Sequence, residues 1–348
     1  MFNKDIRLYS TNEYSKLKLV LVGDAKNLRE WDFDITFKAF FRNYIFTSFG
    51  ANSKVIKQQY VSELLEDLEE LVKTLQSLGV QVVRPEKLKE YPAIKTPYWT
   101  SLCFPALNVR DQAIVIGDTI VETAPQVRGR YLENLQFYNI LLELLKHDKN
   151  MKWLHMPLPT LKDEYVQPTC VTFKEYEPIH PEICIDGAQF IRFNKDIIVN
   201  VSNSNHKLGV EWFKRTFSNY RFHVISITDH HIDSFIVPLS KEVVLLRNKD
   251  IVDKLPDFIK KYKLIFAPEP KSKQFPAYTE DDVILASKYI DINVLSVDGK
   301  HIICNSLFPE LADLLVKNGF EPVLVRHRHR RLFGGGFHCF TLDLYREG

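Results

Sequence analysis

The sequence predicts an α/β protein in which five strand-strand-helix-strand (ββαβ) units close into a ring with pseudo-fivefold symmetry. Three observations lead to this fold class. A helical pattern is followed directly by a short apolar strand five times, and each helical pattern is preceded by a strand or a hairpin. No low-complexity linker divides the 348 residues, so we expect a single domain over residues 1–348.

The helical segments carry apolar residues at helical spacing. In the first of them Leu64, Leu68 and Leu71 recur on one face, and Gly79 marks its end. The five predicted helices, each with the strand that follows it, are 62–78 with 80–83, 131–147 with 151–156, 208–217 with 222–227, 251–261 with 264–267, and 310–317 with 322–325.

Ahead of these helices lie a single strand at 17–22 and hairpins at 113–121, 190–201, 235–246 and 294–304. A doubly wound parallel sheet needs single strands alternating with helices, so the hairpins favour a ring of small sheets instead. We expect the apolar strand at 337–344 to close the ring against the first unit. Residues 31–53 are interpreted as an irregular insertion, a candidate lid over the centre of the ring.

Composition limits the function classes. With 45% hydrophobic and 26% charged residues the chain can bury a large core, and its net charge of +2 gives no general attraction to nucleic acid or an anionic membrane. A small-molecule partner is therefore expected, in the cytoplasm, since no signal core or membrane-spanning stretch is present; a homodimer stays open. Five widely spaced cysteines without a CxxC pair argue against a disulfide framework or a structural zinc site.

The most distinctive motif is FGGGFHCFTLD, at residues 333–343. Three consecutive glycines cost backbone entropy, which predicts close approach of a ligand or another part of the chain. Cys339 follows them and is either a nucleophile or a buried structural cysteine. If residues 337–344 form a strand, His338 faces away from Cys339, so the base must come from another segment.

Four further acid or imidazole side chains occupy the equivalent place in other units, where the chain enters the inner strand: Asp111, Asp186, His231 and Asp233. Taken separately, His231 is a solvated histidine or part of a metal pair with His230, although the ligands are too few for zinc. In a ring, all four would meet Cys339 at the centre. Carboxylates beside a thiol and an imidazole suit a guanidinium, which presents several N–H donors.

The basic run at residues 325–331 lies between a strand and the glycine loop and has no wider basic surroundings. It predicts local salt bridges or contact with an anionic part of a substrate rather than nucleic-acid binding.

The motif GGGFHC followed by FTLD, the HID triplet at 231–233, the segment around Asp186 and the RD pair at 110–111 resemble the amidinotransferase family from about Asp111 to the C-terminus. The resemblance implies the five-bladed pentein α/β-propeller fold. It implies that Cys339 is the nucleophile, His231 the general acid/base and Asp186 its partner. Further implied roles are guanidinium binding by Asp111 and Asp233, donor contact by Ser287, and Arg247 as the nearest candidate for the donor carboxylate. Gln189 departs from the family pattern, which has a second acid there in some members.

The activity that the resemblance implies is transfer of an amidino group from arginine to a small amine acceptor, through a covalent amidino-cysteine and without metal or organic cofactor. Specialised-metabolite biosynthesis is the expected setting. Two alternatives stay open. One is an arginine deiminase-like hydrolase, in which water replaces the amine. The other is a non-catalytic pentein that binds a macromolecule.

Overall fold

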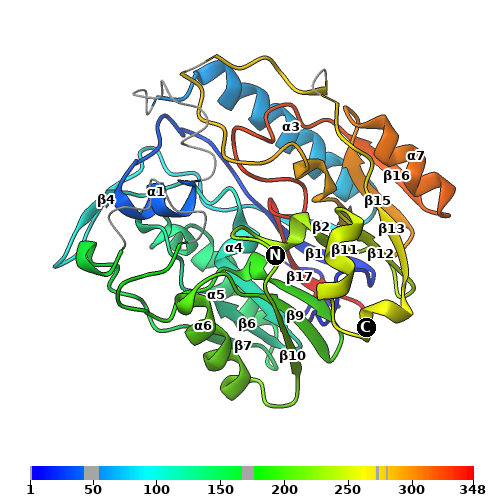
Figure 1. The fold of residues 1–348 in the computed structure, drawn as a ribbon, viewed down its shortest axis with the longest axis horizontal. Coiled ribbons are helices and arrows are strands. Elements are labelled where there is room, and N and C mark those ends of the chain that lie inside the picture. The colour runs from blue at the N-terminus through cyan, green and yellow to red at the C-terminus, as the bar shows by residue number, and fades with distance from the viewer. Residues whose placement is uncertain (1, 43–54, 167–175, 272–273, 280) are drawn as a thin grey trace.

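Five small mixed sheets arranged in a ring make up the protein. A computed structural model describes residues 2–42, 55–166, 176–271, 274–279 and 281–348. In this part of the chain the strands form five three-stranded sheets and a two-stranded one, β3 (Ala93–Lys95) with β4 (Thr100–Leu102). In Figure 1 the helices α3, α6 and α7 lie toward the periphery, whereas β1 and β17 lie near the middle. The predicted ring of repeated units is confirmed.

Every three-stranded sheet has the same plan: the inner strand pairs antiparallel with the middle strand, which pairs parallel with the outer strand. The inner strands are β17 (Thr341–Arg346), β5 (Ala113–Ile116), β8 (Phe190–Phe193), β11 (Ile236–Pro238) and β14 (Leu295–Ser296). The middle strands are β1 (Leu17–Val22), β6 (Thr119–Glu122), β9 (Asp196–Asn200), β12 (Val243–Leu246) and β15 (His301–Asn305). The outer strands are β2 (Gln81–Val83), β7 (Lys152–His155), β10 (Arg221–Ile225), β13 (Lys263–Phe266) and β16 (Glu321–Val325).

Middle and outer strands are joined by a helix in four units: α3 (Gln58–Ser77), α5 (Tyr138–His147), α6 (Ser204–Thr216) and α7 (Pro309–Lys317). The α-helix predicted at 251–261 is wrong, because this segment forms two short 3-10 turns, Lys249–Lys254 and Ile259–Lys261. Pro256 lies between them, where it lacks an N–H and disfavours helical geometry at the preceding residue. The helix predicted from residue 131 begins seven residues later, since 3-10 turns at Arg128–Arg130 and Glu133–Phe137 precede it.

The last strand closes the ring as predicted, because β17 pairs with β1 of the first unit. It begins at Thr341 rather than at residue 337. Residues 337–340 form a turn in which the Phe340 N–H donates to the Gly336 carbonyl over 3.0 Å. The alternation of side chains in a strand therefore does not apply to His338 and Cys339, and the prediction that His338 faces away from Cys339 rested on the wrong local structure.

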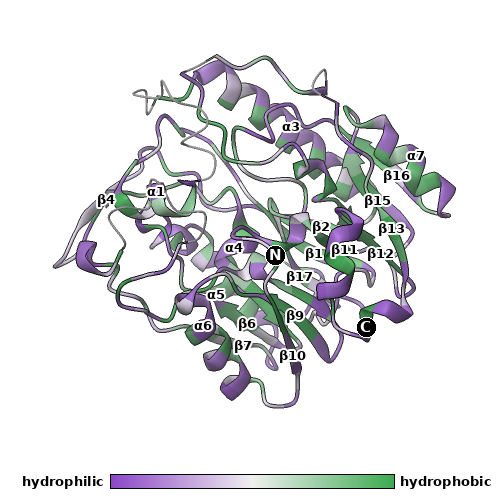
Figure 2. Ribbon diagram, viewed as in Figure 1, coloured by the Kyte–Doolittle hydropathy of each residue, from purple (hydrophilic) through white to green (hydrophobic). Residues whose placement is uncertain are grey.

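Apolar packing occurs between neighbouring units rather than along the axis of the ring. One cluster joins β1 and β17 to the second unit through Leu21, Leu342 and Val115, and a corresponding cluster lies between each further pair of neighbours. Figure 2 shows the strands largely in green and much of the hydrophilic purple in peripheral helices and loops. The axis itself is occupied by buried charged side chains, among them Glu13, Arg192 and Asp343. Because the apolar side chains are buried between units, the centre of the ring is left for polar and charged side chains.

The predicted insertion at 31–53 falls partly outside the described residues, which stop at residue 42 and resume at residue 55. Within its described part, helix α1 (Ile35–Phe40) is capped by Asp34, whose side chain accepts a hydrogen bond from the Phe37 N–H. In the described ranges, the chain has no helix that combines the length and the apolar composition of a membrane span.

Candidate active site

The chain enters every inner strand through one tight turn, and these entries carry the polar residues of the site. The turns are α4 (Val109–Gln112) before β5, a 3-10 turn at Gly187–Gln189 before β8, another at Ile232–Ser234 before β11, a third at Ile290–Ile292 before β14, and the turn at 337–340 before β17. Because the inner strands surround one axis, side chains at their entries converge there. Asp111, Asp186, His231, Asp233 and Cys339 all lie at such entries.

At these entries lies a pocket of about 900 Å³, part of it open to solvent. Cys339, His231, Asp111 and Asp233 line it together. Asp186 does not line the pocket and instead lies behind His231, with Asp186 Oδ2 2.9 Å from His231 Nε2. The remaining wall is mostly apolar and aromatic: Trp31, Phe37, Phe40, Phe41, Phe104, Leu107, Phe235, Leu285, Ile290 and Phe333.

His231 is held between two carboxylates. Its Nε2 bonds Asp186, and its Nδ1 lies 3.3 Å from Asp111 Oδ1 without hydrogen-bond geometry. Burial by itself lowers the pKa of His231, but the field of Asp111 and the hydrogen bond with Asp186 outweigh it and raise the pKa to about 9. For Asp186, the effect of burial is outweighed by the hydrogen bond with His231, which lowers its pKa. At neutral pH the imidazole is therefore a proton donor, with 14% of its side chain exposed.

Cys339 is buried and held as a thiol in the free protein. Burial, and then the negative fields of Asp233 and Asp111, raise the pKa of Cys339 well above the ordinary value. The Sγ atom donates to Asp233 Oδ2 over 3.3 Å, and the Cys339 N–H donates to Asn293 Oδ1 over 2.8 Å. A cation placed against these carboxylates would offset the two fields and favour the thiolate.

Two carboxylates of the pocket each have an oxygen without a hydrogen-bond partner in the described part of the chain. These atoms are Asp111 Oδ1 and Asp233 Oδ1, and both residues are almost fully buried. Burial raises the pKa of Asp111 despite His231 and Arg130, whereas the hydrogen bond from His338 overcomes burial and lowers the pKa of Asp233. Buried carboxylate oxygens without donors are costly, and a guanidinium supplies the missing N–H groups.

No family model matches the chain. Inosamine-phosphate amidinotransferase 1 of Streptomyces glaucescens is 30% identical over 345 residues, covering 97% of this chain and 96% of that protein.

The chain belongs to the amidinotransferase family.

L-arginine:L-lysine amidinotransferase of Pseudomonas savastanoi pv. phaseolicola is also 30% identical, over 85% of this chain and 82% of that protein. Among solved structures, the inosamine-phosphate amidinotransferase of Streptomyces griseus superimposes with a TM-score of 0.86 at 29% identity, over 98% of this chain and 97% of that one. A dimethylarginine dimethylaminohydrolase of Pseudomonas aeruginosa, complexed with citrulline, has a TM-score of 0.57 at 10% identity over 94% of this chain and 99% of that one. The last likeness shows the shared pentein fold alone.

Some residues of the amidinotransferase site were not found from the sequence. Arg130 donates from Nη1 to Asp111 Oδ2 over 2.6 Å and from Nε to Glu133 Oε2 over 2.7 Å, which fixes one edge of the Asp111 carboxylate. Arg130 lies just before the helix predicted from residue 131, and Glu133 lies inside it. The predicted helix therefore hid the buried, non-helical setting of these two residues. Asn293 follows the turn that enters β14, so the same positional rule that selected the acids would have selected it.

Each glycine of the GGG motif has its own structural reason. Gly334 adopts φ +67°, a left-handed conformation. A Cβ on Gly335 would lie 2.1 Å from Asn108 Oδ1, and one on Gly336 would lie 2.7 Å from the Asn293 Cβ and 2.9 Å from its carbonyl oxygen. The predicted close approach is confirmed, and the atoms that approach belong to the enzyme's own asparagines.

We expect Gly336→Ala to lower the free energy of unfolding by about 2 kcal/mol, because the added methyl group overlaps Asn293 in a close-packed site. Displacing Asn293 also removes the acceptor for the Cys339 N–H, so transfer activity should fall as well. Gly319→Ala is the control: Gly319 has φ +86° but open space around its Cβ position, so it adds backbone strain without the clash. Urea unfolding and activity measure both variants, and equal losses would contradict the steric explanation.

Ser287 and Arg247 line the same pocket of the amidinotransferase. The Arg247 guanidinium is stacked 4.2 Å from the Tyr289 ring centre and 4.5 Å from that of Phe235. Gln189, the departure from the family pattern, donates to the His230 carbonyl and accepts from Asn200. In the described residues no three His, Cys, Asp or Glu side chains are grouped to hold a metal ion.

The basic run at 325–331 forms local ion pairs, as the sequence predicted. Arg326 Nε and Arg328 Nη2 lie 3.0 and 2.8 Å from Asp67 Oδ1 on α3, and Arg330 Nε lies 2.7 Å from Asp291 Oδ1. The two pairs with Asp67 fasten the approach to the glycine motif onto the first unit, whereas the pair with Asp291 lies at the entry to β14.

Proposed function

We propose that this amidinotransferase takes its amidino group from arginine and passes it to a small amine through an amidino-cysteine on Cys339. The observation that carries the proposal is the set of groups that line one pocket: a thiol, an imidazole with a pKa raised to about 9, and two buried carboxylates that each have an oxygen without a hydrogen-bond partner in the described residues. The carboxylates accept hydrogen bonds from the guanidinium, the sulfur of the thiol attacks the guanidinium carbon, and the imidazole protonates the departing nitrogen.

In the first half-reaction the guanidinium docks between Asp111 and Asp233, and its positive charge favours loss of the Cys339 proton to solvent. The thiolate forms a bond to the guanidinium carbon and gives a tetrahedral intermediate. His231 then donates its proton to the substituted nitrogen, the carbon–nitrogen bond breaks, and ornithine leaves. The amidino group stays on sulfur as a thiouronium, and His231 is left neutral.

In the second half-reaction an acceptor amine enters the place that ornithine vacated. Neutral His231 accepts a proton from the amine as its nitrogen bonds the amidino carbon, and the carbon–sulfur bond breaks to release the product. The Cys339 thiolate regains its proton from solvent. Asp186 serves both halves, since its hydrogen bond orients the imidazole and stabilises its charged form.

For the rest of arginine we propose Arg247 as the partner of the donor carboxylate and Ser287 as a further polar contact. The aromatic rings on either side of Arg247 hold its guanidinium in the pocket wall. Specialised metabolism is the proposed setting, because an amidinotransferase of a saxitoxin biosynthetic pathway, from Microseira wollei, matches at 27% identity over 98% of both chains with a TM-score of 0.84.

Transfer to an amine is favoured over hydrolysis by the apolar wall, since Trp31, Phe37 and Phe104 restrict water around a thiouronium that water would destroy. The test is incubation with arginine alone and then with a panel of amines. We expect a mass increase of one amidino group on Cys339, little citrulline, and release of ornithine in turnover only when an amine is supplied. Citrulline and ammonia formed from arginine alone, without ornithine, would establish the deiminase-like alternative instead.

We expect the alkaline limb of amidino-cysteine formation to lie near pH 9 and to move to lower pH in Asp186→Asn. His231 must carry a proton to release ornithine, and the hydrogen bond with Asp186 is one of the causes of its raised pKa. The same pairing contributes stability that is fully present below pH 6.5 and is lost as pH rises through about 9. Rapid-quench measurement across pH checks the shift.

The matched control is Asp196→Asn, because Asp196 also pairs with a histidine, His223, but on the surface away from the pocket. This variant should keep the alkaline limb of the native enzyme. An unchanged limb in Asp186→Asn would remove His231 from the role of proton donor.

A further inference from the structure

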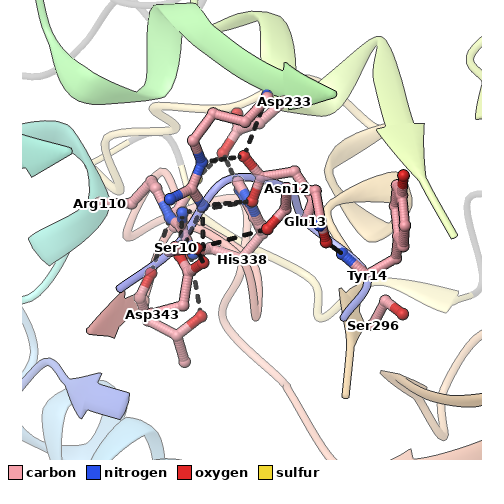
Figure 3. Close-up of polar contacts among 12 residues, drawn as sticks. Ser10, Asn12, Glu13, Tyr14, Arg110, Asp233, Ser296, His338 and Asp343 are labelled. Carbon is pink, nitrogen blue, oxygen red and sulfur yellow. Dashed lines mark hydrogen bonds and ion pairs between the residues drawn. The ribbon is translucent and has the colours of Figure 1, made fainter. Parts of the chain in front are cut away.

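His338, the neighbour of the nucleophile, lies between two buried carboxylates. Its Nδ1 is 2.8 Å from Asp233 Oδ2 and its Nε2 is 3.3 Å from Glu13 Oε2. The side chain is 5% exposed and those of its two partners are no more than 3% exposed. Figure 3 shows His338 with Asp233 above it and Glu13 beside it.

Both contacts require the imidazole to be the donor. An ionised carboxylate accepts hydrogen bonds and has no proton to give. Arg192 keeps Glu13 ionised, with Nε 2.7 Å from Oε1 and Nη2 2.8 Å from Oε2, and the pKa of Glu13 is lowered well below its usual range against the effect of burial. Each ring nitrogen of His338 therefore faces a carboxylate oxygen, which is the arrangement that suits an imidazole with a proton on both nitrogens.

The contact with His338 fixes one oxygen of Asp233. Asp233 Oδ2 accepts from both His338 Nδ1 and the Cys339 thiol, so this oxygen is fully used on the protein side. Asp233 Oδ1 then has no partner in the described residues. Without His338 the carboxylate could turn, and either oxygen could take up the thiol contact.

We propose that His338, held as an imidazolium by Glu13, is a positioning residue that fixes the Asp233 carboxylate so that one oxygen meets Cys339 and the other is left for the guanidinium of the donor. The inference rests on the proposed function of the same pocket. It adds a second imidazole, with a role distinct from that of His231: His338 transfers no proton during the reaction, and its contacts with substrate are all through Asp233.

Buried ion pairs on the axis of the ring hold Glu13, the partner of His338, in place. Asp343 takes ion pairs from Arg192 Nη2 at 2.6 Å and Arg346 Nε at 2.9 Å, and these side chains are buried. Glu13, bound to Arg192, is therefore anchored to β17, the strand that follows Cys339. His338 follows from this network: it is the chain neighbour of Cys339, it bonds Asp233, and its contact with Glu13 connects both residues to the buried charges on the axis.

The test compares His338→Leu, which removes both donors, with His338→Asn, whose amide can donate from nearly the Nδ1 position. Amidino-cysteine formation is followed at increasing arginine concentration. For His338→Leu we expect the half-saturating arginine concentration to rise about 30-fold, since Asp233 loses a charge-assisted hydrogen bond that orients it. His338→Asn should restore most of this loss.

His329→Leu is the control for folding, because His329 is an equally buried histidine that contacts a glutamate, Glu63, outside the pocket. It should leave the arginine dependence unchanged. Equal arginine dependence in His338→Leu and the native enzyme would overturn the proposal, as would equal losses in His338→Leu and His329→Leu, which would mean a purely structural role.

Nitrogen NMR of histidine-labelled native protein tests the charge of His338 in the absence of arginine. The signal that is lost in His338→Asn should be that of an imidazole protonated at both nitrogens, and Glu13→Gln should change it toward a neutral ring. A neutral tautomer in the native protein would overturn the proposal. Failure of the native enzyme to form any adduct from arginine would instead refute the proposed donor, and the NMR result would still decide the state of His338.

Discussion

Replacing Cys339 with alanine should abolish the amidino adduct and reduce transfer by about 10⁴-fold or more, because no other thiol lines the pocket among the described residues. The fold should survive, since the change removes one buried sulfur atom and costs about 1–2 kcal/mol of unfolding free energy. Arginine should still bind, because Asp111 and Asp233 are unchanged. Mass spectrometry, calorimetric titration with arginine and an ornithine assay measure the three quantities.

Cys184→Ala is a suitable control, because Cys184 is an equally buried cysteine outside the pocket and burial raises its pKa well above the ordinary value. It should keep the adduct on Cys339 and full transfer. Transfer that persists in a folded Cys339→Ala protein would contradict covalent catalysis. A cellular function that persists without any transfer would support the non-catalytic alternative.

His231→Gln should slow amidino-cysteine formation from arginine by about 10³-fold, because an amine leaves only after it has gained a proton. The loss should depend on the leaving group. With an S-methylisothiouronium donor, methanethiolate leaves without prior protonation, so the variant should form the adduct at nearly the native rate. Rapid-quench mass spectrometry with both donors gives the two rates.

Two comparisons make this result specific. Cys339→Ala should fail with both donors, since both need the nucleophile. His206→Gln replaces another fully buried histidine, which bonds Gln126 and does not line the pocket, and should behave as the native enzyme. Equal slowing of His231→Gln with both donors would show that His231 orients the substrate rather than supplying a proton.

Much of the fold followed from local patterns because each repeated unit contains its own helix signal, its own turn and its own apolar strands. Helix α3 and the hairpin about Gly117 are examples: Gly79 ends the first, and Gly117 has the positive φ that the tight turn requires. The pattern failed at 251–261, where apolar spacing fits a helix but Pro256 prevents its continuous hydrogen bonds.

Positions within the repeat, more than residue types, located the candidate site. Asp111, Asp186 and His231 were chosen because each precedes an inner strand, and the structure brings them around the same centre. The same reasoning did not select Asn293, although it occupies the corresponding place in another unit and accepts a hydrogen bond from the Cys339 N–H. Glu13 and Arg130 lie outside the entries and had no comparable signal.

By itself the sequence determined the ring of five units, the order of its elements and the residues gathered near the axis, because hydrophobic periodicity and turn residues act over a few positions of the chain. Only the tertiary structure decided which oxygen of Asp233 is left unpaired, that Asp186 lies behind His231, and that His338 contacts the same carboxylate as Cys339. These features depend on side chains from different units meeting at a shared axis. Their distances and charges set the protonation states, and no local pattern specifies them.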